Sequence, residues 1–131
     1  MLEIQDKREN DISYEIRGAI FDVYKELGPG LLESVYEAAL IYELHNRGLQ
    51  VDSQVPVPIK YKGELLNVGY RLDLLVENSV IVELKSVTEL ENIHYKQLLT
   101  YLRLTDHKLG ILVNFNCENI LCNIKRVVNH L

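Results

Sequence analysis

The sequence is poor in cysteine, in proline and in long apolar runs. Its two cysteines, Cys117 and Cys122, are too few for a disulfide scaffold and complete no zinc-binding spacing, so we expect buried free thiols. With three prolines in 131 residues, the composition is that of a globular protein, not a disordered one. No apolar stretch approaches the roughly 20 residues of a membrane span, so we expect a cytoplasmic protein without membrane contact.

The chain also lacks an excess of basic residues, since its formal net charge is −5. Proteins that coat nucleic acid displace counterions with Lys and Arg, so this balance argues against such a role. A metal-dependent enzyme acting on nucleic acid remains compatible with it, because bound metal ions supply local positive charge. The length fits a single domain over 1–131, with residues 1–10 expected to be a flexible N-terminus.

The first third of the chain predicts two helices. Apolar residues recur at helical spacing over about 11–27, and Gly28-Pro29-Gly30 then interrupts the pattern. A second helical pattern covers about 31–47 and ends before Gly48, which offers a left-handed stop.

The middle of the chain predicts strands. Residues 50–61 are rich in Val and Ile but contain two prolines, which suits an irregular or edge strand. Lys62-Gly63-Glu64 is then expected to form a turn. Two further strands are expected over 65–76 and 79–86, with Glu77-Asn78 as a two-residue hairpin loop between them.

The last third predicts a helix followed by at least one strand. Asn92 is a plausible N-cap for this helix, which carries Gln97 and Tyr101 on one stripe. Residues 109–115 form a buried strand candidate, whereas 120–128 are ambiguous between strand and helix. The order of these elements predicts an α/β (α+β) fold with a mixed central sheet flanked by helices.

Asp73 and the triplet Glu83-Leu84-Lys85 are the most informative feature of the chain. In a strand, Glu83 and Lys85 share one face while Leu84 points to the other. Charged residues are seldom buried unless they are paired or bound to a metal, yet these interrupt a core-like apolar run. Carboxylates are suitable Mg²⁺ ligands, and a neighbouring lysine can orient an attacking water and stabilise charge on a phosphate.

Two alternatives stand beside this metal-site hypothesis. The charges can belong to a solvated, salt-bridged edge, in which Arg71 neutralises Asp73. The strict two-residue hairpin also places Asp73 opposite Val82, so that Asp73 and Glu83 point to opposite faces. A bulge or a one-residue longer loop would return both carboxylates to one face, and the sequence leaves this open.

These residues resemble a known family. Asp73 with Glu83-Leu84-Lys85 is similar to the signature of the PD-(D/E)XK nuclease superfamily, and Gly30 to Tyr36 is similar to the element that defines its GxxExxY branch. Further segments typical of this branch are Gly28-Pro29-Gly30, Gln54-Val55-Pro56, Gly69-Tyr70-Arg71-Leu72-Asp73, Gln97 to Leu102 and Gly110 to Phe115. The resemblance covers roughly residues 11–128 and departs at Leu72, where the superfamily name has proline.

The resemblance implies a restriction-endonuclease-like core and a metal-dependent nuclease. It implies that Asp73, Glu83, the Leu84 carbonyl and Glu33 hold Mg²⁺ or Mn²⁺, and that Lys85 assists the attacking water. Without the resemblance, Glu33 would be a residue of the first helical turn that stabilises the helix dipole.

Gln97 and Tyr101 match the Q-x-x-x-Y element of RecB-like nucleases, which borders the active site and helps to hold the nucleic acid. The expected function is hydrolysis of phosphodiester bonds, with DNA as the expected substrate and a homodimer or a protein partner as a further expectation. Two alternatives are a catalytically silent nucleic-acid-binding or regulatory module with the nuclease fold, and a structural protein with buried salt bridges.

Overall fold

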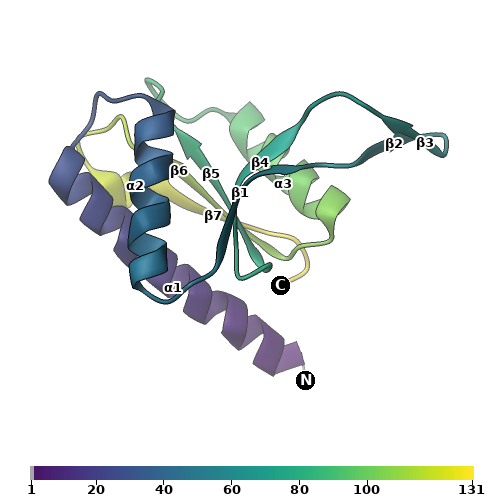
Figure 1. Ribbon diagram of the computed structural model, residues 1–131, viewed down its shortest axis with the longest axis horizontal. Helices are drawn as coiled ribbons and strands as arrows, with labels where there is room; N and C mark the ends of the chain where they lie inside the picture. The colour runs from purple at the N-terminus through teal and green to yellow at the C-terminus, as the bar shows by residue number, and fades with distance from the viewer. Residues whose placement is uncertain (1) are drawn as a thin grey trace.

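Five strands form one mixed sheet that has helices on both faces (Figure 1). The computed structural model describes residues 2–131, with side chains from Arg8 onward. The sheet has the order β1-β4-β5-β6-β7, and only the pair β5 and β6 is parallel. Its strands are β1 (Val51–Pro56), β4 (Arg71–Val76), β5 (Val80–Lys85), β6 (Leu109–Asn114) and β7 (Ile124–Val128). The predicted fold class is confirmed.

Three α-helices cover the two faces of this sheet. They are α1 (Leu2–Leu27), α2 (Glu33–Asn46) and α3 (Asn92–Thr105), and a short 3₁₀ helix, η1 (Ile120–Asn123), precedes β7. Apolar residues of α1 and α2, such as Ile16 and Leu40, pack with Val80 and Val82 of β5 on one face. Leu98 of α3 packs with other strand residues on the opposite face. The sheet is therefore buried on both sides, as the apolar strands predict.

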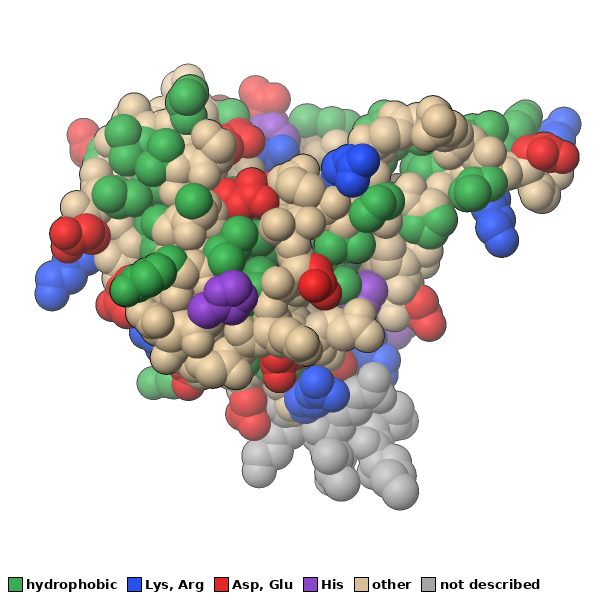
Figure 2. Space-filling model, in the orientation of Figure 1, with side chains coloured by type: hydrophobic (Ala, Val, Ile, Leu, Met, Phe, Trp, Pro, Cys, Tyr) green, Lys and Arg blue, Asp and Glu red, His purple; other side chains and the backbone are tan. Residues whose placement is uncertain are grey.

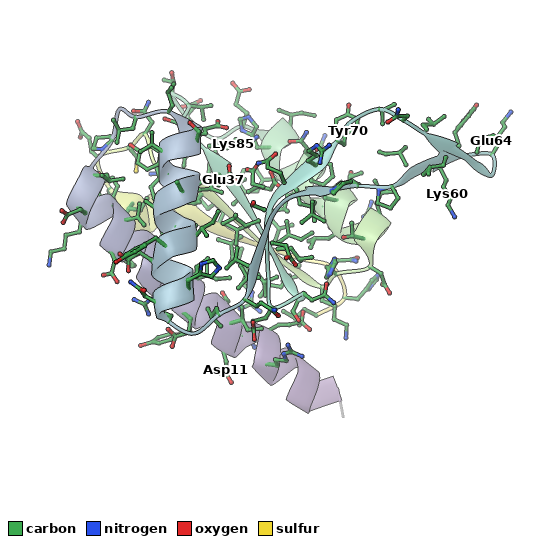
Figure 3. All side chains as sticks on the ribbon, viewed as in Figure 1. Asp11, Glu37, Lys60, Glu64, Tyr70 and Lys85 are labelled. Carbon is green, nitrogen blue, oxygen red and sulfur yellow. The ribbon has the colours of Figure 1, made fainter. Side chains whose placement is uncertain are left out.

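A separate hairpin extends away from the sheet. Strands β2 (Ile59–Tyr61) and β3 (Glu64–Leu66) pair only with each other among the described strands. We call residues 57–70, which contain this hairpin, the arm. Figure 1 shows the arm projecting at the right, and Figure 3 labels Lys60 and Glu64 near its tip and Tyr70 near its base.

The arm changes two predicted strands. The predicted strand over 65–76 is two strands, because the chain leaves β3 at Leu66 and enters β4 only at Arg71. The strand predicted over 50–61 is likewise divided into β1 and β2 near Pro56 and Pro58, which have no N–H to donate to a sheet. The edge position expected for this segment is confirmed, since β1 is the first strand of the sheet.

Several element boundaries also differ from the predictions. α1 begins at Leu2 instead of near residue 11, because Glu, Gln, Lys and Arg continue a helix without an apolar stripe. The flexibility expected for residues 1–10 is not tested and stays a prediction. The N-cap of α3 is Glu91, whose N–H donates to His94 Nδ1 at 3.0 Å, and Asn92 is the first helical residue. The ambiguous segment 120–128 is η1 followed by β7.

Both cysteines are free thiols, as expected. Cys117 is half-buried and Cys122 is exposed, however, so the expectation of burial was wrong. None of the helices within residues 2–131 has the length and apolar character needed to cross a membrane.

Candidate active site

The loop between β4 and β5 sets how the two charged strands face each other. Val76 pairs with Val80, and Leu74 pairs with Val82. The loop therefore contains three residues, Glu77 to Ser79, instead of the predicted two. Continuing this register places Asp73 opposite Glu83. The longer loop is one of the two irregularities that return both carboxylates to a common face.

Regular pairing between β4 and β5 ends at Leu74, and the two carboxylates occupy the next position. The Asp73 N–H donates to Glu83 Oε1 at 3.2 Å, and the Leu84 N–H donates to Asp73 Oδ2 at 2.8 Å. β4 stays paired with β1 as far as Arg71, and β5 stays paired with β6 as far as Lys85. Side chains thus replace backbone partners where the two strands separate.

The side chains of β4 change face at Asp73. Leu72 packs in the cluster under α3, whereas Leu74 packs in the cluster under α1 and α2. Two residues this far apart in a regular strand share one face, so the strand is irregular between them. Gln54, which lies across from Asp73 on β1, has a positive φ of 53°. Both strands are therefore distorted at the level of the carboxylates.

Glu83 is a buried acid beside a second acid. Its side chain lies in the sheet interior, with 5% of the residue surface exposed. Burial, and then the negative charge of Asp73, raises the pKa of Glu83 to about 9, while Lys85 acts in the opposite direction. A site that penalises the ionised carboxylate in this way favours a bound cation.

The salt-bridge alternative for Asp73 is wrong. Arg71 is exposed, and its Nη1 donates to the Gln54 carbonyl at 3.1 Å. Arg47 forms ion pairs with Glu15 at 2.8 Å and with Asp22 at 2.9 Å, which join the end of α2 to α1 and lie apart from Asp73. The carboxylate pair is therefore not the acidic half of an arginine salt bridge.

Glu33 lies at the beginning of α2 and contacts the end of β5. Its Oε1 accepts a hydrogen bond from the Ser86 N–H at 3.2 Å, and Ser86 Oγ donates to the Leu31 carbonyl at 2.7 Å. Glu33 is exposed, and together with Gly30 and Ser86 it lines a hollow of about 550 Å³. Among the described side chains, from Arg8 onward, no three His, Cys, Asp or Glu residues are grouped so that they could hold a metal ion. The structure thus unites Asp73 with Glu83 but leaves Glu33 beside Ser86.

Tyr36 anchors the loop that precedes Glu33. Its ring is buried and stacks on Phe115, with 4.4 Å between the centroids and 5° between the planes. Its hydroxyl donates to the Gly28 carbonyl at 2.6 Å and accepts from the Leu31 N–H at 3.2 Å. Tyr36 therefore has a structural role.

Gln97 and Tyr101 lie on α3 at the same face of the sheet as Glu83. Both line a hollow of about 330 Å³ that Tyr70 also borders. Tyr101 is buried, and burial followed by the charge of Glu83 raises its pKa. Tyr101 is therefore near the carboxylates, whereas Gln97 lies one helical turn away along the hollow.

Three residues at this site were not identified from the sequence: Ser86, Asn114 and Tyr70. Asn114 ends β6 opposite Lys85 and is buried. Its Oδ1 accepts from the Val87 N–H at 3.1 Å, and its Nδ2 donates to the Val87 carbonyl at 3.0 Å. It thereby fixes the chain that follows Lys85. In the sequence, Asn114 could have been noticed as a polar amide at the end of an otherwise apolar strand.

Comparison with known families agrees with this geometry. A family model described as the PD-(D/E)XK nuclease superfamily matches residues 10–127. The comparisons with curated proteins and with solved structures found no match. Because the family match covers most of the chain, the protein belongs to the PD-(D/E)XK nuclease superfamily. Members of this superfamily are generally nucleases that act on nucleic acid and typically use divalent metal ions.

Proposed function

We propose that this protein hydrolyses phosphodiester bonds of DNA with the help of Mg²⁺ or Mn²⁺. The observation that carries the proposal is the carboxylate pair of Asp73 and Glu83, held in the gap between β4 and β5 without an arginine partner. Burial of Glu83 makes its ionised form costly in the absence of a cation.

The oxygen atoms available at this gap suit a hard divalent cation. Asp73 and Glu83 would be the protein ligands, together with the carbonyl of Leu84. The Leu84 N–H points toward Asp73, and in a strand the N–H and C=O of one residue face the same side. One or two carboxylates suffice for Mg²⁺, which usually keeps several waters. Glu33 would be a further ligand after a change of its side-chain rotamer or through a water.

Each remaining residue has a role that its position supports. A bound divalent ion would polarise the phosphate and lower the pKa of a coordinated water. Lys85 shares the face of Glu83 and would orient the attacking water and stabilise negative charge on the phosphate. Gln97 and Tyr101 would border the nucleic acid from α3.

We further assign the chain to the GxxExxY branch and expect it to act in the cytoplasm, as a homodimer or with a protein partner. The arrangement of Gly30, Glu33 and Tyr36 supports the branch assignment, since the tyrosine holds the loop and the glutamate reaches the end of β5. The alternative, a catalytically silent binding module, is supported by the separation of Glu33 from the other two acids.

A cleavage assay tests the proposal. Single-stranded, duplex and branched DNA and RNA are incubated with the protein and Mg²⁺ or Mn²⁺. We expect Asp73→Ala and Lys85→Ala each to lower the rate by at least about 10²-fold, the usual effect of removing a group that stabilises the transition state. Asp11→Ala and Lys25→Ala, at exposed positions of α1, are the matched controls.

The outcomes separate the two functions. Cleavage that survives Asp73→Ala or Lys85→Ala would reject this site. Binding of Mn²⁺ or DNA in calorimetry, without cleavage of any substrate, would favour the silent module.

A further inference from the structure

The arm is attached directly to the strand that carries the candidate active site. It leaves the sheet after Pro56 at the end of β1 and returns at Arg71, two residues before Asp73. Its tip contains only the β2–β3 hairpin, and an isolated two-stranded hairpin is marginally stable in water. A projecting segment of this kind is well placed to contact a ligand of the neighbouring site.

Large apolar side chains of the arm face solvent. The exposed fraction is 62% for Tyr61, 66% for Leu65, 50% for Val68 and 49% for Tyr70. A concentration of exposed apolar side chains in one segment is a common mark of a binding surface. The arm therefore offers aromatic and aliphatic contacts to a partner.

The arm and its base are also basic, in contrast to the chain as a whole. Lys60 and Lys62 lie on the arm and Arg71 at its base, while Glu64 is the one acid of this segment. Figure 2 shows blue side chains at the tip, beneath and at the base of the arm. Because the whole chain has a net charge of −5, this local positive charge points to a negatively charged ligand.

A groove lies between the arm and α3. The hollow of about 330 Å³ is bordered by Ile59 and Tyr70 on one side and by α3 residues, including Ile93 and Lys96, on the other. The rings of Tyr70 and Tyr101 lie 6.3 Å apart, at 58° to each other. Tyr101 in turn lies close enough to Glu83 for that carboxyl group to help raise the pKa of the tyrosine, after the larger effect of burial. The groove is thus bordered by the arm on one side and by Tyr101, a neighbour of the acids, on the other.

We propose that this groove and the arm bind an unpaired nucleic-acid strand and guide it to Asp73 and Glu83. An unpaired strand exposes the faces of its bases, which stack on aromatic side chains, and its phosphates would contact Lys60, Lys62 and Lys96. In a duplex those faces are stacked inside the helix, so an apolar groove would make few favourable contacts with its bases. A second copy of this chain is a poorer occupant, because two paired arms would bring lysines against lysines. The inference rests on the proposed function, since it names the form of its substrate.

Fluorescence anisotropy in the presence of EDTA tests the inference without cleavage. The probes are labelled oligothymidylate, labelled oligouridylate and a labelled blunt DNA duplex. We expect the unpaired strands to bind more tightly than the duplex. Tyr70→Ala should weaken strand binding by about 5- to 150-fold, the range for loss of one stacked base. Tyr14→Ala, an exposed tyrosine of α1, should leave binding unchanged.

The lysines of the arm give a second, independent readout. A double variant, Lys60→Gln with Lys62→Gln, should reduce the slope of log affinity against log salt by about 0.7 for each phosphate that the removed charges neutralise. Lys25→Gln on α1 is the matched control. Both arm lysines are exposed, so this variant stays informative if Tyr70→Ala proves unstable.

Several outcomes would overturn the inference. These are equal or tighter binding of the duplex, absence of strand binding, unchanged strand binding by both arm variants, or a stable dimer in sedimentation that Tyr70→Ala dissociates. Failure of the proposed function is a different result: a wild type that binds strands in EDTA but cleaves none retains the inference. If the wild type cleaves nucleic acid but Tyr70→Ala and the lysine double variant bind strands normally, the proposed function stands and the inference about the arm is rejected.

Discussion

At the scale of single residues, Glu83 is an energetic weakness of the metal-free protein. In EDTA, the free energy of unfolding should fall as the pH rises from about 4.5 to about 9. The folded protein holds the Glu83 proton with a pKa of about 9, whereas the unfolded chain releases it near its ordinary value of 4.5. Between these values the folded state binds more protons, so a rising pH favours unfolding. Urea unfolding at a series of pH values measures this slope.

Glu83→Gln isolates the contribution of this one group. The amide keeps the size of the side chain and an oxygen that can accept from the Asp73 N–H. Near pH 9 we expect the variant to be more stable than the wild type, because the wild type must take up a proton at Glu83 on folding whereas the amide takes up none. Glu37→Gln on α2 should keep the wild-type slope. Parallel pH curves for Glu83→Gln and the wild type would contradict the raised pKa.

Glu33 offers a test that separates a metal ligand from a loop anchor. Glu33→Gln retains an oxygen that can accept from the Ser86 N–H but removes the negative charge. If Glu33 acts on the metal, the variant should need at least about tenfold more Mn²⁺ for half-maximal cleavage, as weakened ligation predicts, with unchanged stability. A titration of the cleavage rate with Mn²⁺ measures this. An unchanged metal requirement would leave Glu33 as the anchor of its loop.

The residues of the site were predictable to different degrees. Asp73, Glu83 and Lys85 stood out because charges interrupt an apolar strand, which is visible in one dimension. The position of Glu33 was implied only by the family resemblance, and its bond to Ser86 depends on tertiary contacts between α2 and β5. Asn114 escaped notice because its partner, the Val87 backbone, lies in a different segment of the chain.

At the scale of elements, the register between β4 and β5 decides whether a site exists. The sequence could not fix the loop length, because both strands are apolar on both faces. Leu74 and Leu75 are both buried, as are Ile81 and Val82, so a shift of one residue exposes no apolar side chain to water. Where both faces of a strand are buried, alternation carries no information about register.

The contact between α3 and β6 gives a prediction at the same scale. Gly110 lies under Leu98, and a Cβ added there would be 2.8 Å from Leu98 Cδ1. Gly110→Ala should therefore destabilise the protein by about 1–3 kcal/mol through overpacking, as measured by urea unfolding. In a protein that already carries Gly110→Ala, Leu98→Ala should lower the free energy of unfolding by less than it does in the wild type, because it removes the side chain that the new methyl group contacts. Strictly additive effects would contradict direct contact between the two positions.

At the scale of the whole molecule, helices cover both faces of the sheet, and strands β4 and β5 separate at Asp73 and Glu83. The layered architecture was predictable from the order of helical and strand patterns. The arm was predictable only in part: the turn expected at Lys62-Gly63-Glu64 is the turn of its hairpin, but its remaining residues read as continuations of the neighbouring strands. The net charge of the chain is acidic, so positive charge for binding nucleic acid has to be local. The lysines of the arm provide one such source, and a cation at the carboxylate pair would provide another.

A divalent cation should consequently stabilise the entire fold. Near pH 8 and at a metal concentration of about 100 times Kd, linkage adds about 2.7 kcal/mol to the free energy of unfolding. For a domain of this size, each kcal/mol raises Tm by roughly 3–5 °C. We expect Mn²⁺ to raise the Tm of the wild type and of Lys85→Ala, but not that of Asp73→Asn, because the proposed site uses the aspartate as a ligand and the lysine only to orient water. Differential scanning fluorimetry measures these Tm shifts. Equal shifts in Asp73→Asn and the wild type would place the metal elsewhere on the molecule.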